Sequence, residues 1–211
     1  MGRDDGHEHR SHAPIDEHGE PPLGRRARAI EALLIEKGLL TAAEIRRAID
    51  DLASRSPADG AKLVARAWVD PAFKARLLAD PKAATPEFGI DITSHAQLAV
   101  LENSPGLHHL VVCTLCSCYP RTLLGPPPAW YKSLDYRSRA VVDPRGVMRE
   151  FGLELPATVE VRVVDSTADM RYLVLPLRPA GTERLSEEEL RALVTRDSMI
   201  GVSHPRDPVR V

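Results

Sequence analysis

The sequence predicts an α+β fold, with a helical amino-terminal arm followed by a layered globular domain of the α-β-β-α type. Apolar residues recur at helical spacing through residues 25–57, which form the arm. After Pro86, short apolar runs typical of strands occur in two separate regions, with helical patterns between and behind them. A chain of 211 residues with 43 % apolar content is long enough for one ordinary domain and such an arm.

The first segment, residues 1–24, carries four of the eight histidines and six carboxylates, and has no apolar periodicity to bury. We therefore predict a disordered acidic leader. Its histidines are irregularly spaced, which favours a solvated tail over a dedicated metal site. It has no apolar signal core, and no run in the chain approaches the roughly 18 apolar residues of a membrane span. These features predict a soluble cytoplasmic protein.

The arm is predicted to hold two helices. The first starts at Arg25 and ends at Gly38, a residue typical of helix ends. The second starts at Thr41, because the sequence Thr-Ala-Ala-Glu is a capping box that closes the first turn of a helix.

The domain, residues 58–211, begins with helices predicted near Ala58 and at Pro71, where proline suits a first helical turn. Two strands are then expected at residues 98–101 and 110–112, separated by the turn-like sequence of residues 102–106.

The second half of the domain also combines helical and strand-like patterns. Residues 133–151 look helical, with a break at Asp143-Pro144, and valines alternate with polar residues from Val159 to Val163, as in a half-buried strand. A fourth strand is expected over residues 172–177. A last helix is predicted from Ser186, which opens a second capping box, to about Arg196.

The charge balance and the cysteine content limit the classes of function that the chain can have. With 28 basic against 30 acidic residues and 4 % aromatics, the chain has no obvious nucleic-acid surface. Its three cysteines, Cys113, Cys116 and Cys118, fall within six residues. A disulfide scaffold spreads its cysteines to close loops, so this crowding predicts a metal site or thiol chemistry.

The spacing of this segment allows main-chain nitrogens to bind a metal together with the sulfurs. The Cys118 sulfur and its own amide close a five-membered ring with an ion, as do the amides of Ser117 and Cys118, whereas the Cys116 sulfur and the Ser117 amide close a six-membered one. Cys-Ser-Cys can thus supply a plane of two sulfurs and two nitrogens, with Cys113 axial and a sixth position open. Such a set suits low-spin trivalent cobalt or iron acting as a Lewis acid.

Spacing alone leaves other interpretations open. His108 or His109 would complete a Cys₃His zinc site in a non-catalytic interaction module, although zinc sites usually pair two separated ligand knuckles. A Cys-x-x-Cys redox pair is a further alternative, but it would leave the third cysteine idle.

Residues 112–118, Val-Cys-Thr-Leu-Cys-Ser-Cys, resemble the metal-binding signature of nitrile hydratase alpha subunits, a family that also contains the gamma subunit of thiocyanate hydrolase. The resemblance covers roughly residues 25–203. Further segments similar to the family occur in family order at residues 60–71, 128–133, 136–139, 178–182 and 194–201.

The resemblance implies a non-corrin Co(III) or Fe(III) held by the Cys113 thiolate, by Cys116 as sulfinate, by Cys118 as sulfenate, and by the Ser117 and Cys118 amides. Thr114 resembles the cobalt type rather than the iron type. The family's arginines that hold the oxidised sulfurs belong to a beta-type partner subunit, so this chain alone is not expected to be a competent enzyme. A metal-loading activator protein is also implied.

The implied reaction is the hydration of a nitrile to an amide, with the Cys118 sulfenate oxygen as nucleophile or base. Arg121 stands where many nitrile hydratases have tryptophan, and thiocyanate hydrolase gamma subunits resemble this chain there. A guanidinium favours a small anion such as thiocyanate, although Arg121 facing solvent or a partner carboxylate explains it equally well. Asp165 and Asp169 resemble acidic positions that tune the family's site from outside the coordination shell; turn or capping roles are the alternative.

Overall fold

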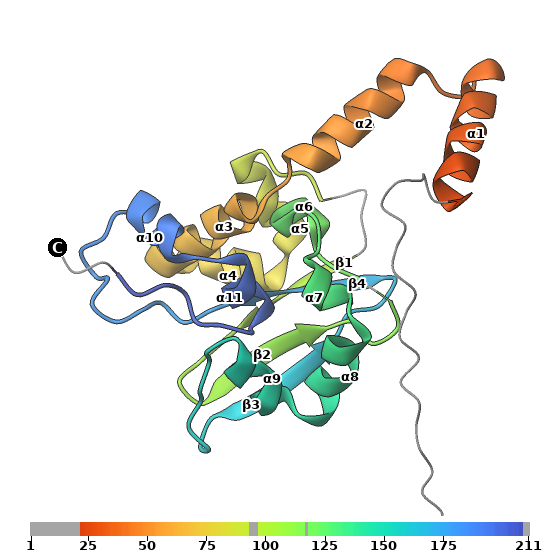
Figure 1. Cartoon of the computed structure of the whole chain (residues 1–211). Helices are drawn as coiled ribbons and strands as arrows, with labels where there is room; N and C mark the ends of the chain where they lie inside the picture. Colours follow the sequence, from red (N-terminus) through yellow and green to blue (C-terminus); the bar gives the residue numbers. More distant parts are fainter. Residues whose placement is uncertain (1–21, 93–96, 117, 209–211) are drawn as a thin grey trace, which may run out of the picture. The chain divides into compact units, whose positions relative to one another are not determined.

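The computed structural model describes residues 22–92, 97–116 and 118–208 (Figure 1). Contacts divide the chain into two compact units, with the boundary between Ala48 and Ile49. The leader predicted for residues 1–24 lies outside the described residues except for its last three, which belong to the first helix. Within the described part, no helix is long and apolar enough to cross a membrane.

Helix α1 spans Pro22–Glu36 and helix α2 spans Ala42–Ser54. Gly38 ends the first with a left-handed φ of +66°, as its position in the sequence predicts. The predicted capping box before α2 is present: the Glu44 amide donates to Thr41 Oγ1 at 3.2 Å, and the Thr41 amide donates to the Glu44 carboxylate at 2.8 Å.

Three consecutive helices each begin with a proline. They are α3 (Pro57–Val69), α4 (Pro71–Ala79) and α5 (Pro81–Ala84), followed by the 3₁₀ turn η1 (Thr85–Phe88). Asp70 and Asp80 cap α4 and α5 by accepting a hydrogen bond from the amide three residues on. The Asp-Pro pairs therefore stop one helix and start the next, which folds this segment into short turns.

Four strands form two parallel pairs. Strand β1 (Gln97–Glu102) pairs with β4 (Met170–Leu175), and β2 (Leu107–Val112) pairs with β3 (Glu160–Asp165). Strands β1 and β2 are neighbours in sequence but lie in different pairs. The pairs meet through contacts between β2 and β4.

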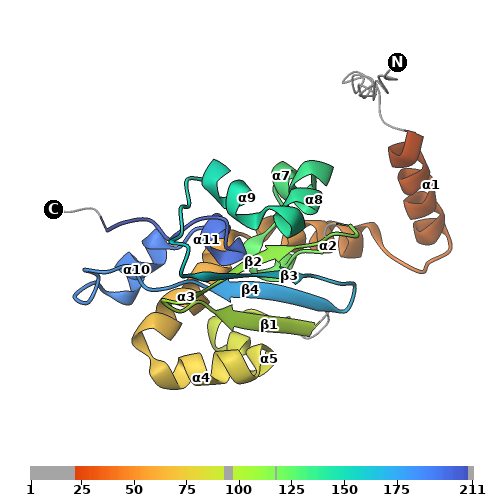
Figure 2. The same cartoon turned by 90° about the horizontal axis from the view of Figure 1, so that it is seen from below.

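Helices cover both sides of these strands (Figure 2). Helices α4 and α5 contact β1, whereas α8 (Leu134–Val142) contacts β2 and α9 (Pro144–Glu150) contacts β3. The α+β class with a helical amino-terminal region is thus confirmed. The remaining helices are α6 (Arg121–Leu124), α7 (Ala129–Lys132), α10 (Glu187–Leu193) and α11 (Arg196–Ile200).

The carboxyl-terminal helices differ from the prediction of a single helix ending near Arg196. Helix α10 stops at Leu193, and Thr195 caps the new helix α11 by accepting a hydrogen bond from the Ser198 amide at 3.0 Å. A threonine that can satisfy a helix start competes with helix continuation, which explains the interruption. The break predicted at Asp143-Pro144 is present between α8 and α9.

Candidate metal centre

The three cysteines gather directly after β2. The Cys113 and Cys116 sulfurs are 3.6 Å apart, the Cys116 and Cys118 sulfurs 3.2 Å apart, and all three lie within 4.8 Å of one another. The Cys116 amide donates to the Cys113 sulfur at 3.3 Å, so the turn between them closes on itself. Cys113 and Cys118 are buried and Cys116 is exposed. Ser117, whose amide is a ligand in the sequence-based prediction, lies outside the described residues.

These distances fit a single bound ion. Two sulfurs each about 2.3 Å from one metal are about 3.3 Å apart at a right angle and about 3.8 Å apart at the tetrahedral angle. The Cys116–Cys118 separation of 3.2 Å is near the right-angle value, and the Cys113–Cys116 separation of 3.6 Å lies between the two values, so both are compatible with one ion. Three thiolates are also a soft donor set, which suits a transition metal.

The two histidines that could complete a Cys₃His zinc site form hydrogen bonds to other groups. His108 Nε2 donates to the Gly201 carbonyl at 2.8 Å and its Nδ1 accepts from the Asn103 side chain at 3.1 Å, a pattern that assigns the neutral tautomer. His109 donates from its amide and its Nδ1 to the Asn103 oxygen. Burial lowers the pKa of both histidines. Among the described residues, no histidine or carboxylate joins the three-sulfur cluster.

The surroundings of Cys118 favour the protonated thiol when no metal is bound. Burial, strengthened by its sulfur neighbours, raises the pKa of the Cys118 thiol to about 12, while the positive charge of Arg171 acts in the opposite direction. Without a cation this thiol keeps its proton at neutral pH. Metal binding replaces that proton, because the thiolate is the form that coordinates.

Asp165 and Asp169, the two acidic residues singled out in the sequence, lie in different places. Asp165 ends β3, where its carboxylate accepts from the Thr114 amide at 2.9 Å and from the Thr114 hydroxyl at 2.5 Å. Asp169 is exposed, and its main-chain carbonyl accepts from the Gln97 amide at the start of β1. The structure thus brings Asp165 to the cysteine segment, but Asp169 to the start of the β1–β4 pair.

Other contacts to this segment come from residues that the sequence analysis did not assign to the site. Arg137 Nε donates to the Cys113 carbonyl at 3.0 Å and Nη2 donates to the Thr114 carbonyl at 2.6 Å. The Tyr131 hydroxyl donates to the Cys118 carbonyl at 2.8 Å. Main-chain carbonyls are acceptors at every position, so no side-chain pattern marks these contacts in the sequence.

Trp130, in the segment that follows the triple proline, is half-buried and packs against the core. Its ring makes edge contacts with Tyr136 at 4.8 Å and with Phe151 at 4.7 Å between ring centroids. Because Tyr131 next to it reaches the Cys118 carbonyl, this segment supports the cysteines from the interior.

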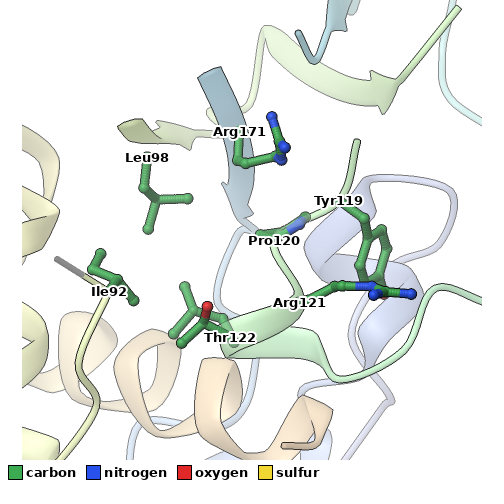
Figure 3. Close-up of a pocket in the computed structure, with 8 residues that line it drawn as sticks. Ile92, Leu98, Tyr119, Pro120, Arg121, Thr122 and Arg171 are labelled. Atoms are coloured by element: carbon green, nitrogen blue, oxygen red, sulfur yellow. The ribbon is translucent and has the colours of Figure 1, made fainter. Parts of the chain in front are cut away.

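A small hollow of about 130 Å³ is lined in part by the residues that follow Cys118 in the chain (Figure 3). Arg121 at the start of α6 and Arg171 of β4 both line it, together with apolar side chains such as Ile92 and Leu98. Tyr119, the residue after Cys118, forms another wall. The hollow thus combines an apolar lining with two arginines, one from α6 and one from β4.

These observations define an α+β protein with a three-cysteine site suited to a transition metal. Residues 22–203 match the family described as nitrile hydratase, alpha chain, and the chain belongs to that family. This confirms the resemblance drawn from the sequence.

Individual relatives span nearly the whole chain. The low-molecular weight cobalt-containing nitrile hydratase subunit alpha of Rhodococcus rhodochrous is 52 % identical over 191 residues, covering 88 % of this chain and 90 % of that protein. The thiocyanate hydrolase subunit gamma of Thiobacillus thioparus is 44 % identical over 194 residues, covering 87 % and 80 %. A solved double mutant of the Fe-type nitrile hydratase from Comamonas testosteroni Ni1 superposes with a TM-score of 0.80 at 46 % identity, covering 88 % and 91 %.

Proposed function

We propose that this chain is the metal-bearing alpha subunit of a nitrile hydratase, which hydrates nitriles to amides together with a beta-type partner. Three sulfurs within 4.8 Å of one another, in a member of this family, are the main support. The ligands are Cys113, Cys116, Cys118 and the amides of Ser117 and Cys118. Low-spin, non-corrin Co(III) is the preferred metal over Fe(III), in accord with Thr114 and with the cobalt-containing relative.

When bound, the trivalent ion supplies Lewis-acid chemistry, polarising a nitrile carbon or acidifying a water. The chain's own contribution is an oxidised pair of sulfurs, Cys116 as sulfinate and Cys118 as sulfenate. The Cys118 sulfenate oxygen acts as nucleophile or base toward the substrate, because it is fixed beside the position the substrate takes. Asp165 supports the site from outside through Thr114, and Asp169 acts there only indirectly, through the start of β1.

Two further proteins belong to this proposal. The beta-type subunit provides the arginines that hold the oxidised sulfurs, and an activator protein loads the metal. We place the enzyme in the cytoplasm, where clustered cysteines such as these are typical of metal or thiol sites.

Metal analysis and mass spectrometry of the purified, assembled enzyme test the proposal. One cobalt or iron per chain, with two added oxygens on Cys116 and one on Cys118, supports it. Zinc with unmodified thiols overturns it in favour of a non-catalytic zinc-stabilised module.

The role of Cys118 is tested by Cys118→Ser, which is expected to abolish nitrile turnover. Leu115→Ala is the matched control, because Leu115 lies in the same segment with 82 % of its surface exposed and is no ligand. If Cys118→Ser keeps its metal and still hydrates nitriles, the assigned role is wrong.

A second candidate function is the hydrolysis of thiocyanate, as the gamma-type subunit of such an enzyme. Arg121 and Arg171, which both line the hollow that Tyr119 also lines, support it, since guanidinium groups bind small anions. Comparing nitrile and thiocyanate turnover for the wild type and for Arg121→Trp separates the two candidates. Thiocyanate hydrolysis that disappears in Arg121→Trp favours the second function, whereas nitrile hydration without thiocyanate hydrolysis favours the first.

A further inference from the structure

We propose that Arg137 of α8 is a positioning residue for the metal centre, fixing the main chain of Cys113 and Thr114 so that the cysteine sulfurs keep their binding arrangement. This inference rests on the proposed function, because it concerns how the same centre is held.

The contacts of Arg137 are aimed at the main chain of the ligand segment. One planar guanidinium donates from Nε to the Cys113 carbonyl at 3.0 Å and from Nη2 to the Thr114 carbonyl at 2.6 Å. Two donors in one rigid fork fix two successive peptide groups at once, which a flexible ammonium does not do.

Thr114 is therefore hydrogen-bonded through its amide, its hydroxyl and its carbonyl. Its amide and hydroxyl donate to Asp165 of β3, and its carbonyl accepts from Arg137 of α8. The turn from Cys113 to Cys116 passes through this residue, so immobilising Thr114 restrains the 3.6 Å separation of the two sulfurs.

The charge of Arg137 is also available to the site. Among the ion pairs of the described residues, none involves Arg137, whereas Arg139 on the same helix pairs with Asp135 and Glu150. The Cys113 thiolate, the two oxidised cysteines and two deprotonated amides would carry five negative charges against three positive ones on a trivalent ion. A guanidinium half-buried against this segment partly offsets the excess.

The experiment compares Arg137→Gln, Arg137→Lys and the control Arg139→Gln in the assembled enzyme. The main readout is the rate at which a chelator removes the metal that the wild type carries. It is accompanied by the sulfur-to-metal charge-transfer absorption, the melting temperature, and separate kcat and KM values. Supporting residues of metal ligands typically contribute about 10- to 100-fold to affinity or activity.

We expect Arg137→Gln to release metal about 10- to 100-fold faster, to shift the absorption band and to lower kcat with little change in KM. Arg137→Lys keeps the charge but not the fork, so it should rescue only part of the loss. Arg139→Gln should lower the melting temperature at most and leave metal release and absorption unchanged, because it breaks only the two surface ion pairs with Asp135 and Glu150.

Wild-type metal release and absorption in a folded Arg137→Gln enzyme overturn the proposal, as does complete rescue by Arg137→Lys. Should Arg137→Gln fail to assemble, Arg137→Lys decides alone: faster release supports the proposal, and wild-type release overturns it. The release rate refers to whichever metal the wild type holds. A wild type that contains zinc or does not hydrate nitriles therefore contradicts the proposed function without deciding the role of Arg137.

Discussion

Substituting Gly201 with alanine probes the contact that fixes strand β2, the strand that leads into Cys113. Gly201 follows α11 with a φ of +91°, and a β-carbon there would lie 1.9 Å from the carbonyl oxygen of His109. Its own carbonyl accepts the hydrogen bond from His108. The obstacle is main chain inside a buried strand, so it cannot move aside as the end of a flexible side chain can.

Two costs add in Gly201→Ala. A left-handed conformation costs a residue with a β-carbon about 1–2 kcal/mol. Forcing a methyl group into packed surroundings costs about 1–3 kcal/mol more. The sum is about 2–5 kcal/mol, and for a chain of this size each kcal/mol lowers the melting temperature by about 2–4 °C. We therefore expect a decrease of about 4–20 °C.

Gly152→Ala is the matched control, because Gly152 has a φ of +80° but a β-carbon there would meet no heavy atom within 4 Å. It carries only the conformational cost, about 1–2 kcal/mol. Thermal unfolding of the assembled enzyme, followed by circular dichroism, gives both melting temperatures under one condition. A Gly201→Ala enzyme that melts no lower than Gly152→Ala refutes the contact with His109 as a source of stability.

Three more predictions use other parts of the domain. Leu173→Ala removes a fully buried side chain of β4 and should lower the free energy of unfolding by about 2–5 kcal/mol in denaturant titrations, whereas Leu177→Ala, at a side chain that is 42 % exposed, should cost clearly less. Ser186→Ala removes the α10 cap and should cost about 0.5–2 kcal/mol; an unchanged denaturation midpoint would contradict that role. Burial lowers the pKa of His108, so the unfolded chain binds more protons and the melting temperature should fall as pH drops below about 6.5; a similar fall in His108→Gln speaks against this source.

Local signals explain why most element boundaries could be predicted. The Thr41 capping box and the Asp143-Pro144 break act on the few residues around them, and both appear in the structure as the sequence predicts. The prediction for the last helix is too long because Thr195 starts a new helix within it. The pairing of the strands is a different matter. Strand periodicity identifies a strand but not its partner, and β1 joins β4 across nearly half of the domain.

At the candidate site, too, features carried by neighbouring residues could be predicted from the sequence, whereas contacts between distant residues could not. Cys113, Cys116 and Cys118 could be identified because the sulfur donors are side chains that the sequence shows directly, and here they are only a few residues apart. Tyr131 and Arg137 reach main-chain carbonyls of that segment from α7 and α8, and nothing in the sequence distinguishes those carbonyls from any others.

The sulfur atoms and the contacts that position them come from different parts of the chain. The sulfur donors come from a single short peptide, whereas their separation is set by β3, α7 and α8, which reach that peptide through hydrogen bonds to its main chain and to Thr114. Changing a cysteine removes a ligand. We expect changes of Asp165, Tyr131 or Arg137 to leave the three sulfurs in the chain and to alter only how the peptide that carries them is held. Variation among these three residues can therefore tune metal retention and reactivity without changing which atoms bind.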